Sequence, residues 1–61
     1  MFSDLFESSM KEKKGLTFYL KGQTIAGIVT KILSQHAIEV RNQTHSRIVI
    51  RIDCIDAIAL N

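Results

Sequence analysis

Near the N-terminus, apolar residues recur at the spacing of one helix face: Phe2, Leu5, Phe6 and Met10. Ser3 is a favourable residue to begin a helix, and Gly15 can adopt the left-handed conformation that ends many helices. The pattern predicts a short amphipathic helix over residues 3–14. Its apolar stripe must pack against the rest of the chain.

Beyond the helix, the spacing changes to the alternation and β-branched runs that are typical of strands. Five such segments follow one another: residues 16–20, 24–34, 37–41, 47–53 and 54–60. Gly22 lies in the turn between the first two segments. The second segment keeps no strict period of two and contains Gly27, which indicates a bulge or a sharp bend. The sequence therefore predicts a mainly β fold, in which a short N-terminal helix precedes a five-stranded, strongly bent antiparallel barrel over residues 16–60.

The chain has only 61 residues, so we expect a single domain over residues 1–61. A domain this short buries only about 60% of the surface of its unfolded chain, and it usually needs a further source of stability. Cys54 is the only cysteine, and with His36 and His45 it matches no zinc-binding spacing. We therefore expect no intrachain disulfide, no metal and no cofactor, which leaves assembly with further copies as the stabilising device.

No apolar run approaches the roughly 18 residues of a membrane span, and the N-terminal segment does not resemble a signal peptide. Together with the lone cysteine, this predicts a cytoplasmic protein with no membrane partner. The net charge of +2 permits a nucleic-acid partner without requiring one. The chain carries neither paired carboxylates nor a Ser-His-Asp order, so we do not expect an enzyme.

Two stretches of the sequence resemble the motifs of the Sm/Lsm superfamily and its bacterial Hfq proteins. The residues that match the first motif are Leu20, Gly22, Ile25, Gly27, Val29, His36, Val40 and Asn42. The second motif is matched by Ile50, Arg51, Ile55 and Ile58. The resemblance spans nearly the whole chain and implies an Sm-like fold, with the expected helix in front of it.

The same resemblance implies a homo-oligomeric ring, hexameric or heptameric, that binds single-stranded RNA as an RNA chaperone or RNA-stability factor. Ring closure would pair the edge strands of neighbouring copies and so remove an aggregation hazard. From the sequence we expect the bent second strand and the final strand, residues 54–60, to supply these edges.

The resemblance places Gln35 and His36 at the RNA-binding site, where Hfq has a Gln-Phe pair. A flat, exposed ring can stack on a base, a contact worth about 1–3 kcal/mol, and an amide can read the edge of a base. The alternative is a surface His36 that only caps a loop.

Arg51 belongs to the same expected site. Its planar guanidinium can stack on the opposite face of the base that His36 holds. The alternative is an ion pair between strands, with Asp53, Asp56 or Glu39 as the partner.

Further candidates for the RNA surface are cations and one aromatic residue. Lys11 and Lys14 can attract phosphates, or they can simply favour the negative end of the helix. Arg41 and Arg47 can line a rim. Tyr19 can stack on a base at the face away from the helix, or it can contact another subunit.

The chain departs from the two motifs at Ser34, Ile38, Ile52, Asp53 and Cys54. These changes put the family's preference for uridine in doubt more than its fold. They also define a second hypothesis, in which an Sm-fold ring has lost RNA binding and serves as a protein-interaction scaffold.

Overall fold

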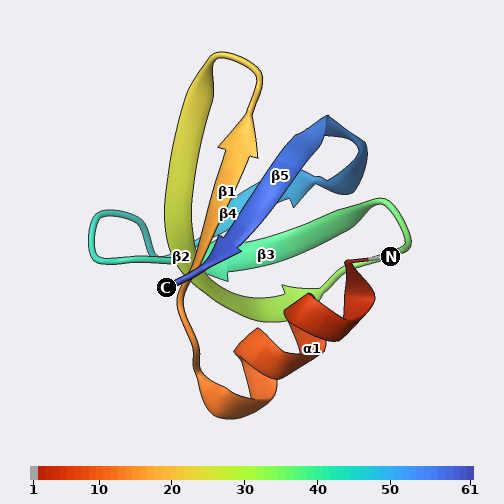
Figure 1. Cartoon of the computed structure of the whole chain (residues 1–61). Coiled ribbons are helices and arrows are strands. Elements are labelled where there is room, and N and C mark those ends of the chain that lie inside the picture. The colour runs from red at the N-terminus through yellow and green to blue at the C-terminus, as the bar shows by residue number, and fades with distance from the viewer. Residues whose placement is uncertain (1) are drawn as a thin grey trace.

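The computed structural model describes residues 2–61, which form one helix and a single five-stranded antiparallel sheet. The elements are α1 (Ser3–Glu12), β1 (Leu16–Leu20), β2 (Gln23–Ile32), β3 (Ala37–Arg41), β4 (Ile48–Arg51), the 3-10 turn η1 (Ile52–Cys54) and β5 (Ile55–Leu60). The strands lie in the order β4-β3-β2-β1-β5 (Figure 1). The expected fold class, a helix followed by five antiparallel strands, is confirmed.

The helix is shorter than the residues 3–14 that the sequence predicts. It ends at Glu12, and Lys13 rather than Gly15 takes the left-handed conformation, with a φ of 56°. Ser9 Oγ donates a 2.6 Å hydrogen bond to the carbonyl of Lys14, which holds this reversal ahead of the glycine. The expected N-cap is also wrong, because Ser3 is the first helical residue and Phe2 occupies the cap position without a side-chain hydrogen bond.

Strand β2 carries the bend of the sheet (Figure 1). Its first half pairs with β1 as far as Gly27, and its second half pairs with β3 from Ile28 onward. A Cβ atom at position 27 would lie 2.5 Å from Val40 Cγ1 and 2.6 Å from the carbonyl oxygen of Arg41, so only glycine fits there. A register shift between Val29 and Lys31 adds the predicted bulge.

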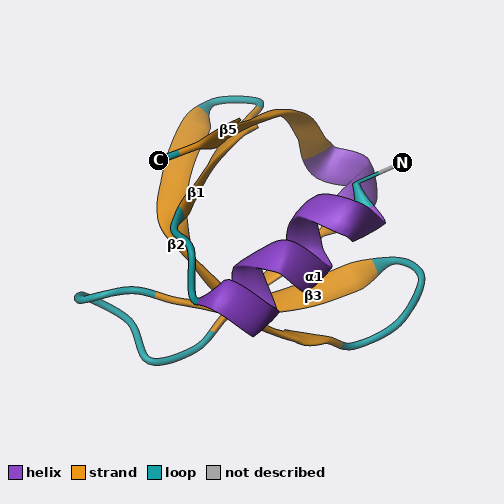
Figure 2. Ribbon diagram, turned by 60° about the horizontal axis from the view of Figure 1, so that its bottom comes forward, coloured by secondary structure: helices purple, strands orange, loops and turns teal. Residues whose placement is uncertain are grey.

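The core forms where the curved sheet and the helix meet (Figure 2). Its buried apolar residues are Phe6, Leu16, Phe18, Val29, Ile38, Val40, Ile50 and Ile55. Among the residues described here, Ser9 is the only buried polar one, and its Oγ accepts a 3.0 Å hydrogen bond from the Val29 N–H. Because β2 has left β1 by this point, the helix supplies the acceptor that the neighbouring strand no longer offers.

The sheet is bent but it does not close into a barrel. Within residues 2–61, β4 and β5 pair only with β3 and β1 respectively, so these two strands are the edges. The expectation that β2 is an edge strand is wrong, because β2 lies at the centre of the sheet. After η1 the chain enters β5, which pairs with β1 and not with β4, so no ladder joins the two edges of the sheet.

Edge strand β5 ends in a feature typical of an incomplete core. Leu60 lies directly opposite the buried Leu16 and so faces inward, yet 56% of Leu60 is exposed.

Within residues 2–61, no helix has the length and the apolar character needed to cross a membrane.

Candidate nucleic-acid interface

Gln35 and His36 project from the connection between β2 and β3, and both are exposed. This connection is held by its own backbone, because the N–H groups of Leu33 and Ser34 both donate to the carbonyl of Ala37, at 3.0 and 3.2 Å. The His36 N–H donates to Ser34 Oγ at 3.0 Å. The turn therefore presents both side chains to solvent from an ordered backbone.

The turn lies beside η1, which follows β4. The His36 carbonyl accepts a 2.8 Å hydrogen bond from the Ile52 N–H, and Ala37 is the ladder partner of Arg51. The backbones of Gln35, His36 and Arg51 thus lie at the same end of the β3–β4 ladder.

The side chain of Arg51 makes an ion pair. Its Nη2 lies 3.0 Å from Asp53 Oδ2, while 71% of the arginine side chain and 63% of the aspartate side chain remain exposed. Of the three partners considered from the sequence, Asp53 is the one observed. Such an exposed pair is worth only about 0–1 kcal/mol, so a ligand can displace it at little cost, and the guanidinium keeps further donors free.

Two hollows flank η1. The first, which we call the turn groove, has a volume of about 480 Å³ and lies between the start of α1 and the β2–β3 connection. Its lining includes the apolar Phe2, Phe6, Ile32 and Ile52, together with the polar Ser34 and Gln35.

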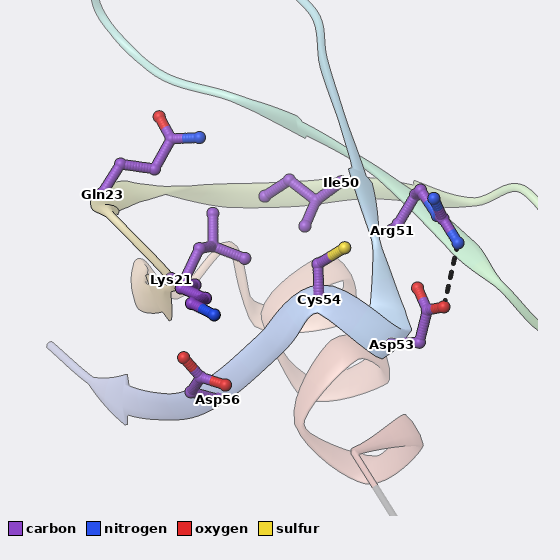
Figure 3. Close-up of a pocket in the computed structure, with 8 residues that line it drawn as sticks. Lys21, Gln23, Ile50, Arg51, Asp53, Cys54 and Asp56 are labelled. Atoms are coloured by element: carbon purple, nitrogen blue, oxygen red, sulfur yellow. Dashed lines mark hydrogen bonds and ion pairs between the residues drawn. The ribbon is translucent and has the colours of Figure 1, made fainter.

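The second hollow, which we call the seam groove, has a volume of about 490 Å³ and lies where the unpaired edges β4 and β5 approach the β1–β2 turn (Figure 3). Leu20, Ile50 and Cys54 form its less polar part. Charged and amide side chains surround them: Lys21, Gln23, Arg51, Asp53 and Asp56.

The two grooves separate the side chains of the expected site. Gln35 lines the turn groove and Arg51 lines the seam groove, although the residues that follow them in the chain, His36 and Ile52, are joined by a backbone hydrogen bond. Sequence reasoning did not identify Lys21 or Gln23 as site residues, and it considered Asp56 only as a partner for Arg51. No motif marks these three residues, because only the folded topology brings them together.

The two expected lysines lie away from His36. Phe2, just before α1, lines the turn groove, whereas Lys11 lies in the last turn of this ten-residue helix, about 15 Å long, and Lys14 follows its end. Lys14 Nζ also pairs with Glu12 Oε1 at 3.0 Å. Lys11 and Lys14 therefore lie apart from His36.

Arg41 and Tyr19 also lie apart from this site. Arg41 ends β3, at the opposite end of that strand from His36, beside the loop that follows β3. Tyr19 is 44% exposed on β1, between Thr24 of β2 and Ala57 of β5. The structure does not bring either residue together with His36.

Glu39 is held by two neighbouring side chains. Arg47 Nε donates to Glu39 Oε1 at 2.6 Å, and Thr30 Oγ1 donates to Oε2 at 3.0 Å. The Arg47 hydrogen bond, assisted by Thr30, lowers the pKa of the Glu39 carboxyl below its ordinary value of 4.5. Glu39 is thus the partner of Arg47 and not of Arg51.

Neither a protein-family model nor a curated protein matches this chain.

Proposed function

We propose that this chain is a cytoplasmic single-stranded RNA-binding protein of the Sm/Hfq type, which acts without catalysis as an RNA chaperone or RNA-stability factor. The observation that carries this proposal is the hydrogen bond between the His36 carbonyl and the Ile52 N–H. It holds an exposed imidazole and an exposed guanidinium on neighbouring segments, one after β2 and one at the end of β4.

Flat side chains beside cations are the usual means of holding an unpaired base. His36 offers the ring, Gln35 offers an amide for a base edge, and Arg51 can leave Asp53 for a base or a phosphate. The outlying Lys11, Lys14 and Arg41, with Tyr19, would contact the parts of a longer RNA that extend beyond the central site.

We further propose that the protein works as a ring of six or seven copies. Two edge strands with free backbone groups favour pairing between β4 of one copy and β5 of the next, and such head-to-tail contacts form rings when the rotation closes. The exposed, inward-facing Leu60 supports this proposal, since a neighbouring copy would cover it.

A second candidate function, a ring that serves as a protein scaffold, is favoured by one observation. Asp53 forms an ion pair with Arg51 and places a negative charge next to the expected site. A carboxylate there repels phosphates, which an RNA-binding surface normally attracts.

The test is binding of fluorescent oligo(U), oligo(A) and oligo(C) to the assembled protein at low salt. We expect binding in the micromolar range or tighter, and His36→Ala should weaken it about 5- to 150-fold, which corresponds to the loss of one stacked base. His45→Ala is the matched control, because His45 is an exposed histidine in the loop after β3, and it should bind almost as wild type.

A ring that binds none of the oligonucleotides would contradict the RNA proposal and favour the scaffold. Equal losses for the two histidine variants would contradict the assignment of His36.

A further inference from the structure

We propose that the seam groove is a second base-binding site, which selects a base with an exocyclic amino group, namely adenine, cytosine or guanine, over uracil. This inference rests on the RNA-binding function proposed above and names the chemistry of the base that the protein would prefer next to His36.

The position of the groove supports a continuous path for one strand of RNA. Arg51 belongs both to the proposed His36 site and to the lining of the seam groove. The backbone of Ile52 separates the two and is hydrogen-bonded to His36. A base that follows the one on His36 therefore meets the seam groove after it passes a single turn of the chain.

The shape and the polarity of the groove suit a flat base. Its lining includes Leu20, Ile50 and Cys54, and Figure 3 shows Ile50 and Cys54 between Lys21 on one side and Arg51 on the other. Apolar surface of this kind can contact the face of a base, while the polar groups around it contact the base edge.

The charges of the groove favour a neutral base over a phosphate. The two cations, Lys21 and Arg51, are balanced by the two carboxylates, Asp53 and Asp56, so the lining carries no net charge. In Figure 3 the Arg51–Asp53 pair lies on one side of the groove, with Lys21 and Asp56 on the other. A phosphate would meet as much repulsion as attraction there.

The carboxylates also determine which base edge fits. An ionised carboxylate can only accept hydrogen bonds, and carboxylates in proteins characteristically accept from the exocyclic amino group of cytosine. Uracil carries a carbonyl oxygen where cytosine carries that amino group, so it would place an acceptor against an acceptor. Asp56 makes no ion pair among residues 2–61, which leaves it free for this contact, and Gln23 and Lys21 can donate to ring nitrogens or carbonyls.

Cys54 is the only cysteine of the chain, and it reports directly on this groove. The experiment measures the rate of maleimide labelling of Cys54 in the assembled full chain, alone and with oligo(C), oligo(A) or oligo(U) at saturating concentration. We expect oligo(C) and oligo(A) to slow labelling at least about 5-fold, with little effect of oligo(U).

Binding of the same oligonucleotides to Asp56→Asn tests the base-edge contact. We expect the preference for oligo(C) over oligo(U) to fall about 5-fold or more, the size of one specific base contact. Asp4→Asn is the matched control, because it makes the same change of charge on an exposed helix residue outside the groove, and it should keep the preference.

The outcomes separate this inference from the proposed function. RNA that binds in a His36-dependent manner while Cys54 is labelled at an unchanged rate would overturn the second site alone. A thiol that is unreactive before RNA is added would also overturn it, because a neighbouring copy would then fill the groove. An unchanged base preference in Asp56→Asn would overturn the edge contact. Failure of every oligonucleotide to bind would overturn the proposed function itself.

Discussion

At two places in this molecule a strand lacks a hydrogen-bonding neighbour on one side. The first place is covered by the helix, and the second is left open. Where β2 leaves β1, the helix is close, and Ser9 Oγ accepts the hydrogen bond of the buried Val29 N–H. Along the outer edges of β4 and β5, no strand within residues 2–61 takes the neighbour's place.

The comparison distinguishes a backbone group that the chain satisfies by itself from strand edges that are free to pair with another molecule. The covered place is closed by one short side chain from an adjacent helix turn. Along the open edge of β5, Leu60 faces inward but remains exposed, and the seam groove at the start of the same strand is lined by charged groups in equal numbers of each sign. Stability should therefore depend mainly on the first place, and assembly and binding on the second.

The largest effect is expected when the covered place is opened by Ser9→Ala. The Val29 N–H would remain buried without an acceptor, and the Lys14 carbonyl would lose its donor, so the free energy of unfolding should fall by about 2 kcal/mol. Chemical denaturation at one fixed protein concentration measures this loss. Ser8→Ala is the control, because it makes the same change one residue earlier in the helix, and a loss of equal size in both variants would contradict the role of Ser9.

A smaller effect, confined to assembly, is expected from Leu60→Lys at the open edge of β5. A lysine at this already exposed position should change the unfolding of a single copy by less than about 0.5 kcal/mol. It should nevertheless weaken each contact between copies, because it places a charge where we propose that a neighbour covers Leu60. Light scattering should then show a smaller assembly than wild type at the same concentration.

Leu33→Lys is the control for assembly, since Leu33 is an exposed leucine that lies outside both edge strands. If wild type is a monomer, or if the two variants dissociate equally, the proposed pairing of β4 with β5 is wrong.

The smallest effect concerns Glu39, which lies on β3 between the two places. Its folded-state pKa is lowered by Arg47 and Thr30, so its contribution to stability is present above pH 4.5 and is lost as the pH falls through the lower pKa of the folded state. Glu39→Gln should slightly lower the melting temperature at pH 7 and should reduce its further decline between pH 4.5 and 3.

Melting curves at pH 7, 4.5 and 3 measure this dependence. Glu7→Gln is the control, because Glu7 is exposed on the helix and forms no ion pair within residues 2–61. An acid dependence of Glu39→Gln that parallels that of wild type would contradict the assignment.

Local pattern was sufficient to predict most of the elements. The predicted strands 16–20 and 37–41 coincide with β1 and β3, because alternation with β-branched and aromatic residues is a local property. The end of the helix was predicted too late, since its position depends on the hydrogen bond from Ser9 to Lys14, a contact that no periodicity reveals.

Pairing between distant segments was harder to predict. The sequence indicated that the second strand is bent but not that it is central, because strand order depends on which segments meet in space. The nearness of His36 to Arg51 was implied by the family resemblance alone. The seam groove could not be predicted from either source, since its lining comes from the β1–β2 turn, β4, η1 and β5.

The close approach at Gly27 has a consequence for recognising relatives of this chain. A side chain there would collide with Val40 and with the backbone of Arg41, so the bend of β2 admits no other residue without a change in the sheet. Surface positions such as Gln35 or Asp56 can vary with the ligand. In divergent sequences, a glycine in the middle of a long β-rich run, thirteen residues before the valine that it touches, is therefore a more durable marker of this fold than any residue of its binding surface.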